Sequence, residues 1–196
     1  MNTKLKTRSR VAQVTLVAGA LALAGGQLVA PDALHAQATP LAASPGGETS
    51  ARATLVDQTG AEVGTATFTE TPNEGVLIHV RLTAAPTGEH ALHVHEAGRC
   101  EPFSAAGDHY APEDDAHGIL HEEGSHAGDL PNLLVPEDGR LEVDLVARDL
   151  TLLPNESNTI FDGDGSALIM HQGADDYSSQ PSGDAGPEIA CGVILR

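Results

Sequence analysis

Histidine supplies the most distinctive chemistry of this sequence, because it accounts for ten of the 196 residues and several copies occur in short, ordered segments. His93 and His95 are two apart, so on a β-strand both imidazoles point to the same face. Further histidines follow in a long segment and at the end of a later apolar run. Imidazole nitrogens suit copper and zinc, and a carboxylate is a common additional zinc ligand. The candidate metal-binding residues are His93, His95, His109, His117, His126, Asp129 and His171.

Two simpler interpretations compete with a metal centre. The His93/His95 pair alone is typical of a polar strand face, and an acidic loop rich in histidine could be a loose metal-scavenging tract. Most of these histidines, however, lie close to glycine or proline in the chain. Such residues fix the local backbone, which favours a built site.

The elements that must position these side chains are strands. Apolar and polar residues alternate in short segments from residue 50 onwards, the pattern of half-buried β-strands. The predicted strands are residues 51–56, 61–70, 76–83, 89–95, 130–135, 141–148, 166–171 and 189–195. Turn residues separate them and helical periodicity is almost absent. About eight short antiparallel strands should therefore form a sandwich or a barrel.

Two segments lack any period: residues 96–129 and residues 172–187, both rich in glycine, proline and acidic residues. Loops of this length in a small domain are usually functional. The first contains four histidines, so we expect it to carry part of the site.

The N-terminus predicts export. Residues 1–10 carry four basic residues and no acid, residues 11–30 are apolar and uncharged, and Ala36-Gln37-Ala38 offers the small residues of a cleavage site. This order indicates a secretory signal peptide over residues 1–38. An uncleaved membrane anchor is the alternative, since about 20 apolar residues can span a bilayer. Residues 39–49 would then form a flexible linker to a domain over residues 50–196.

The charge of the remaining chain excludes several partners. Residues 39–196 contain six arginines, no lysine and 27 acidic residues, a net charge of −21. Nucleic acids and anionic membranes need a cationic face, so neither is expected to bind. An acidic chain without lysine indicates adaptation to high salt, and ordinary tuning of solubility is the alternative. Disorder is a further interpretation, which the recurrent apolar alternation opposes.

The two cysteines, Cys100 and Cys191, indicate one disulfide, because an even count in an exported chain favours pairing. Closing a loop of about 90 residues should stabilise the fold by roughly 4–5 kcal/mol in the chain-entropy description.

Six segments together are typical of one family. They are His93-Val-His95-Glu-Ala-Gly-Arg-Cys100, Ala106-Gly-Asp-His109-Tyr-Ala-Pro112, His117-Gly118, His126-Ala-Gly-Asp129-Leu130, Met170-His171-Gln-Gly-Ala-Asp175 and Ala190-Cys191-Gly-Val-Ile194. In their order and gaps the sequence resembles the copper/zinc superoxide dismutases over about residues 50–196. The cysteine five residues after His95 is similar to that of the bacterial, exported branch.

The resemblance implies an all-β fold, an eight-stranded Greek-key barrel or sandwich of immunoglobulin-like kind, with two long loops over the metals. It implies a copper site of His93, His95, His109 and His171, and a zinc site of His109, His117, His126 and Asp129. His109 would then bridge the two ions. Asp175 would link a copper-binding histidine to a zinc-binding one. The cysteines would join the first loop to the last strand, and His90 would be structural.

The implied reaction is dismutation of superoxide to dioxygen and hydrogen peroxide, as an antioxidant defence in the periplasm or outside the cell. The four copper-binding histidines would be the catalytic residues. Dimers are common in the family, so a homodimer is an expectation, and no membrane contact is expected after signal cleavage.

One residue departs from the family. The family has an arginine three residues before the second cysteine, where it docks superoxide; this chain has Glu188, and residues 172–187 contain no lysine or arginine. A copper-binding protein with little dismutase activity, for copper storage or transfer, is therefore the alternative function. A purely structural barrel is a further alternative. His79 and His121 are both expected to face solvent.

Overall fold

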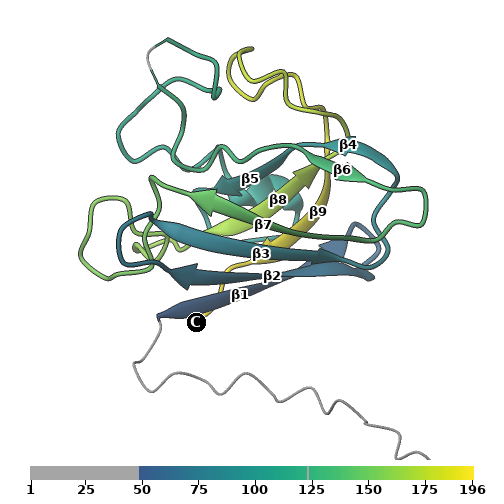
Figure 1. The fold of residues 1–196 in the computed structure, drawn as a ribbon, viewed down its shortest axis with the longest axis horizontal. Helices are drawn as coiled ribbons and strands as arrows, with labels where there is room; N and C mark the ends of the chain where they lie inside the picture. Colours follow the sequence, from purple (N-terminus) through teal and green to yellow (C-terminus); the bar gives the residue numbers. More distant parts are fainter. Residues whose placement is uncertain (1–48, 123) are drawn as a thin grey trace, which may run out of the picture. The chain divides into compact units, whose positions relative to one another are not determined.

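The computed structural model describes residues 49–122 and 124–196, which form antiparallel β-structure with one short 3-10 helix (Figure 1). The predicted signal peptide lies outside the described residues, as does the predicted linker except for Thr49. In the part of the chain that is described, no helix is long and apolar enough to cross a membrane.

Nine strands follow one another along the chain, and all of their pairings are antiparallel. They are β1 (Ser50–Asp57), β2 (Glu62–Glu70), β3 (Val76–Leu82), β4 (Gly88–His90), β5 (Leu92–His95), β6 (Leu133–Val135), β7 (Leu141–Ala147), β8 (Ala167–His171) and β9 (Glu188–Val193); the 3-10 helix η1 is Phe103–Ala106. Seven strands form one curled sheet in the order β5-β8-β9-β1-β2-β3-β7, and β4 pairs with β6 in a second, small sheet. The all-β prediction is confirmed.

The alternating strands bury the face that the sequence predicts. In β3, Val76, Ile78, Val80 and Leu82 are buried while the residues between them are partly or fully exposed. β1 and β2 repeat the pattern, and Leu55 and Phe68 are fully buried in the same core. Removal of this apolar surface from water is the main force that holds the sheet.

The strand predicted over residues 89–95 divides at Ala91. Its first part, β4, pairs with β6, whereas its second part, β5, pairs with β8 in the large sheet. The Ala91 amide leaves the ladder and donates to the Gly173 carbonyl at 2.8 Å, while its own carbonyl accepts from the His171 amide at 3.0 Å. The chain thus changes sheet directly before the two histidines of β5.

The long loop after β5 covers the free edge of that strand. Backbone hydrogen bonds join Val94 to Gly128 at 2.9 Å and to Tyr110 at 2.8 Å, and Glu96 to Asp108 at 3.0 Å. Figure 1 shows this loop and the loop between β8 and β9 on the same side of the strands. The edge pairing carries loop residues to the histidine-bearing face of β5.

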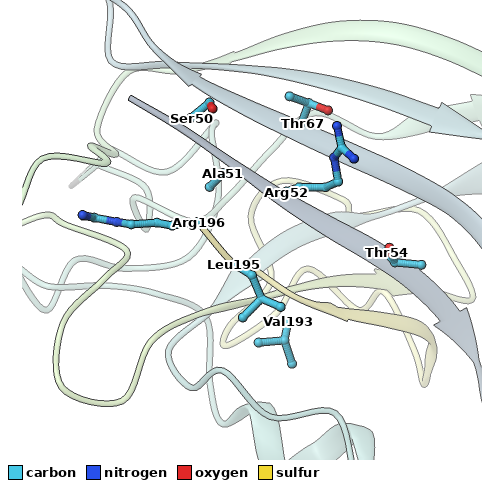
Figure 2. A pocket seen from close by; sticks show the side chains of 8 residues that line it. All are labelled: Ser50, Ala51, Arg52, Thr54, Thr67, Val193, Leu195 and Arg196. Carbon is cyan, nitrogen blue, oxygen red and sulfur yellow. The ribbon is translucent and has the colours of Figure 1, made fainter. Parts of the chain in front are cut away.

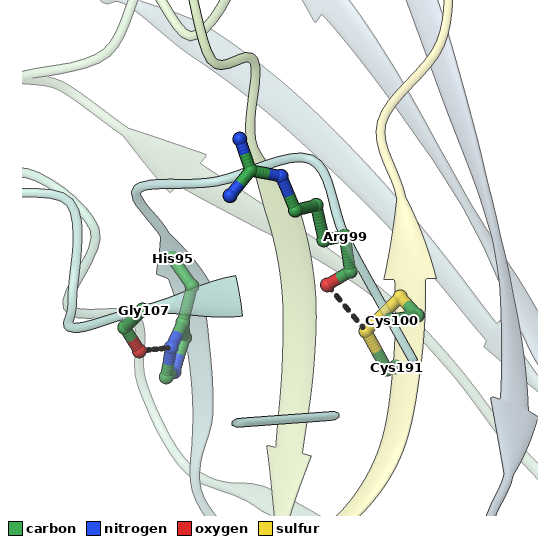
Figure 3. The surroundings of a disulfide bond; sticks show 5 residues. All are labelled: His95, Arg99, Cys100, Gly107 and Cys191. Atoms are coloured by element: carbon green, nitrogen blue, oxygen red, sulfur yellow. Dashed lines mark hydrogen bonds between the residues drawn. A yellow bond between two sulfur atoms is a disulfide. The ribbon is translucent and has the colours of Figure 1, made fainter. Parts of the chain in front are cut away.

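The disulfide between Cys100 and Cys191 is present, and the two cysteines are separated by 91 positions in the sequence (Figure 3). It ties the start of the long loop to β9. Beneath it, Ala167 and Ile169 of β8 pack with Ala106 and Cys191 in a small second core. β8 is buried on both faces for this reason, because Leu168 and Met170 belong to the main core.

Candidate metal centre

Two neighbouring strands carry three of the predicted histidines. His93 and His95 project from β5, and His171 ends β8, its neighbour in the sheet. All three are buried, with exposures of 0%, 3% and 5%. The two-residue spacing in β5 accounts for the shared direction of His93 and His95.

The covering loop adds the remaining ligands. Isolated β-bridges pair His95 with His109 and His93 with Asp129, so both loop residues lie directly beside β5. His117 and His126 lie in the part of the loop between His109 and Asp129, and His117 is fully buried.

The seven predicted residues form two groups that share one member. Possible ligand atoms lie within 4.8 Å of one another in each group. The groups are His93, His95, His109 and His171, and His109, His117, His126 and Asp129. The His109 ring centroid lies 3.9 Å from that of His93 and 5.1 Å from that of His117. The structure therefore brings together every residue that the sequence proposed for the two sites.

Six ring nitrogens in these groups are buried without a hydrogen-bond partner among the described residues. They are Nδ1 of His93, Nε2 of His95, Nε2 of His109, Nδ1 of His117, Nδ1 of His126 and Nε2 of His171. A buried polar atom normally has a partner, because leaving it unpaired costs about 1–3 kcal/mol. Six such atoms in one place are explained by metal ions, which take these nitrogens as ligands.

His109 presents one nitrogen to each group. Its Nε2 is unpaired, whereas its Nδ1 lies 2.9 Å from an oxygen of Asp129. The other Asp129 oxygen lies 3.0 Å from Nδ1 of His117, without hydrogen-bond geometry. An arrangement of nitrogen and oxygen lone pairs at these distances suits zinc, for which both are common ligands.

The opposite ring nitrogens are fixed by the protein. Nδ1 of His95 donates to the Gly107 carbonyl at 2.9 Å (Figure 3), and Nδ1 of His171 donates to the Gly186 carbonyl at 3.0 Å. These bonds select the tautomer that leaves Nε2 free, which is how proteins orient metal-binding imidazoles.

Asp175 connects the two groups, because it contacts one histidine of each. Its two oxygens accept hydrogen bonds from Nε2 of His93 and Nε2 of His117, both at 3.0 Å. Burial alone would raise the pKa of Asp175, but these bonds and one from the Tyr177 amide outweigh it and hold the pKa below its ordinary value. The carboxylate remains charged and can orient both rings.

Burial also keeps the imidazoles of His93, His95 and His171 neutral. It lowers the pKa of His93 to about 4 and that of His95 to about 3, and it lowers the pKa of His171 as well. At neutral pH these rings therefore keep their lone pairs. For Asp129, burial would raise the pKa, but its close contacts with the surrounding histidines and the hydrogen bond from the Gly118 amide hold the pKa far below its ordinary value.

Two side chains that the sequence did not single out position the site. The amide of Asn132 accepts from the Asp175 N–H and donates to the Asp175 carbonyl, each at 2.9 Å. In the same manner, the side-chain amide of Gln180 accepts a hydrogen bond from the His117 N–H at 2.9 Å and donates one to the His117 carbonyl at 2.8 Å. Nothing in the spacing of these residues marks them, because each acts on a segment distant in sequence.

The other histidines lie outside both groups. His90 is buried, with ring nitrogens 2.9 Å from the His171 carbonyl and 3.1 Å from the Pro86 carbonyl, consistent with a structural role. The His79 ring on the outer face of β3 is 42% exposed, as predicted, and contacts Asp144. His121 is half-buried, so it faces solvent only in part.

Glu188 lies beside the group that contains His93, His95 and His171. It begins β9 and pairs in register with His171 of β8. It lines a pocket of about 710 Å³ together with His95, His109 and His171. Partial burial raises the pKa of its carboxyl.

We expect Asp175→Asn to weaken binding of both metals by about 10–100-fold, because one of the two accepting carboxylate oxygens becomes an NH2 group, which cannot accept from the imidazole N–H that faces it. Zinc and copper affinities measured by competition with chelators test this. Asp184→Asn is the matched control, since Asp184 is exposed in the same loop. Unchanged affinities in Asp175→Asn would contradict its orienting role.

The family described as copper/zinc superoxide dismutase (SODC) matches residues 62–194. A Cu-Zn superoxide dismutase of Aquifex aeolicus is 43% identical over 147 residues, which are 74% of this chain and 85% of the relative. The Cu-Zn superoxide dismutase of Escherichia coli K12 is 34% identical over 69% of this chain and 80% of its own. Among solved structures, a SOD-like protein from Bacillus subtilis has a TM-score of 0.71 at 38% identity, covering 74% of this chain and 97% of that one.

Proposed function

Because this chain belongs to the copper/zinc superoxide dismutase family, we propose that it dismutes superoxide at a copper ion that His109 connects to a zinc ion. Copper and zinc are the cofactors of the family. We assign copper to His93, His95, His109 and His171, and zinc to His109, His117, His126 and Asp129. The observation that carries this proposal is the convergence of six unpaired, buried imidazole nitrogens on two adjacent positions.

The overall reaction consumes two superoxide ions and two protons and yields one dioxygen and one hydrogen peroxide. A bound copper ion supplies the one-electron redox couple for this exchange. The protein must hold that ion in a fixed set of imidazoles, leave one side open to a diatomic substrate, and deliver protons.

We assign to His109 the delivery of a proton to the peroxide product. Its Nε2 belongs to the group to which we assign copper, its Nδ1 is held beside Asp129, and the residue is one of those that line the open pocket. A proton taken up at Nε2 would lie at the position where the peroxide product is released. General acid–base assistance of this kind typically contributes 10²–10⁴-fold.

The zinc-side residues keep His109 in place. Asp129 accepts hydrogen bonds from the amides of Gly118 and His126, at 2.9 and 3.1 Å, so its position is fixed by the loop backbone. Zinc has no redox chemistry of its own and would stabilise the loop.

We further propose that the protein acts after export, in antioxidant defence outside the cytoplasm. Its disulfide supports this location, because such bonds persist in oxidising compartments. A signal peptide at residues 1–38, adaptation to high salt and a homodimer remain predictions.

Metal analysis of the exported protein, combined with a superoxide-decay assay, tests the proposed function. We expect one copper and one zinc per chain and dismutase activity that depends on copper. A protein that holds both metals and is inert would contradict the dismutase assignment.

Glu188 specifically favours a second candidate, a copper-binding protein with little dismutase activity. A carboxylate beside the pocket repels superoxide, and electrostatic guidance is worth about 10–10³ in association rate. We expect Glu188→Arg to raise kcat/KM at low ionic strength by roughly tenfold, with Glu137→Arg in a distant exposed turn as the control. If Glu188→Arg is active and the wild type is not, storage or transfer of copper becomes the better assignment.

A further inference from the structure

The pocket over the copper-side histidines has a floor of imidazoles and a rim of carboxylates. His95, His109 and His171 line it, each at least 94% buried and each with an unpaired Nε2. Five acidic residues also line it, and we call them the acidic rim. They are Glu96, Asp108, Asp114, Asp115 and Glu188.

The acidic rim is not neutralised by cations. None of the six described arginines lines this pocket. Arg99 and Arg148 pair with Asp164 and Glu74, on the outside of the molecule. Arg52 and Arg196 line a different pocket beside β1 and β9, where their guanidinium groups point in different directions (Figure 2).

The carboxylates and the histidines of this pocket differ in how deeply they are buried. Glu96, Asp108, Asp114 and Asp115 are exposed and Glu188 is half-buried, whereas the three histidines are buried. An entering ion therefore meets carboxylate oxygens first and imidazole nitrogens afterwards. Oxygen ligands hold copper more weakly than the four-histidine site should, so they can capture it without retaining it.

We propose that the acidic rim is a capture site for copper ions, which makes the mouth of the pocket an entry route for cations. This inference rests on the proposed copper site and adds how that site is filled. A cleft lined by one sign of charge concentrates ions of the opposite sign and can raise association rates by 10–10³. The same field disfavours small anions at the loaded site.

Copper uptake by the zinc-loaded, copper-free protein tests the proposal. Cu²⁺ is mixed with the protein in a non-coordinating salt, and the Cu(II)–imidazole absorption band is followed by stopped flow. We expect the second-order rate constant to fall at least about tenfold between 0.01 M and 1 M salt, as the Debye length shrinks from about 30 Å to 3 Å.

Variants locate the effect. At low salt, Glu188→Gln should slow uptake by about threefold, and Glu188→Gln combined with Asp114→Asn by about tenfold, within the range for a charged cleft. Glu137→Gln removes the same charge from an exposed turn that lines none of the described pockets, and its rate should equal that of the wild type. The salt dependence of the wild type requires no variant and so does not depend on how the variants fold.

Azide gives an independent readout on the copper-loaded protein. Its binding, followed by the azide-to-copper charge-transfer band, should be several-fold tighter in Glu188→Gln than in the wild type at low salt. The difference should vanish at 1 M salt.

The outcomes separate two failures. Copper uptake that is independent of salt and equal in all variants would overturn the capture site while leaving the copper site intact. Failure of the wild type to take up one copper per chain would contradict the proposed function itself, and this inference with it.

Discussion

We expect His109→Ala to lower dismutase activity by at least about 100-fold and to reduce the content of both metals. His109 is the one residue that belongs to both groups, so its removal takes a ligand from each. It also removes Nε2, to which we assign the proton, and loss of general acid–base assistance alone costs 10²–10⁴-fold. Metal content and superoxide decay, measured on the same preparation, test this expectation.

His79→Ala is the control for His109→Ala, because it removes an imidazole from the outer face of β3 without touching the site. Circular dichroism should show that both variants keep the β-structure. If His109→Ala retains more than a tenth of the wild-type activity with both metals bound, the shared-ligand assignment is wrong.

The second large effect concerns stability. We expect Cys100→Ala combined with Cys191→Ala to lower the free energy of unfolding by about 4–5 kcal/mol, because the cross-link closes a loop of 91 residues. Denaturant unfolding of the wild type and the double variant measures this difference. Reduction of the wild-type disulfide should produce most of the same loss, and a difference below about 1 kcal/mol would contradict the estimate.

Loss of the disulfide should also reach the metal centre. The loop that it anchors contains Gly107, whose carbonyl fixes the His95 ring (Figure 3). A looser loop no longer selects the His95 tautomer, so copper affinity should fall along with stability.

The strands with one buried face could be predicted from sequence. In β3 and β1 the alternation of apolar residues records which side meets the core, and the structure follows it residue by residue. The division at Ala91 had no such signal, because it depends on backbone partners at Gly173 and His171. β8 was predicted as a strand, but its burial on both faces was not, because the core on each face is formed by segments distant in sequence.

The residues of the two candidate groups could be predicted to lie together, because metal coordination restricts residue type and spacing together. The residues that hold them in place could not. Asn132 and Gln180 act across 43 and 63 residues of sequence, and an amide that bonds backbone atoms leaves no pattern in residue type. The degree of burial of His121 could not be predicted for a similar reason: burial in a long loop is decided by what the loop packs against.

The pairing of the long loop with β5 has a consequence for self-association. β5 ends the large sheet, and the loop occupies the backbone hydrogen-bonding groups of Val94 that would otherwise face outwards. An open strand edge is a template on which other chains add strands and aggregate. The segment that contributes His109 and Asp129 thus also protects the strand edge from intermolecular pairing. Conditions that detach it should expose β5 as a seed for intermolecular β-sheet.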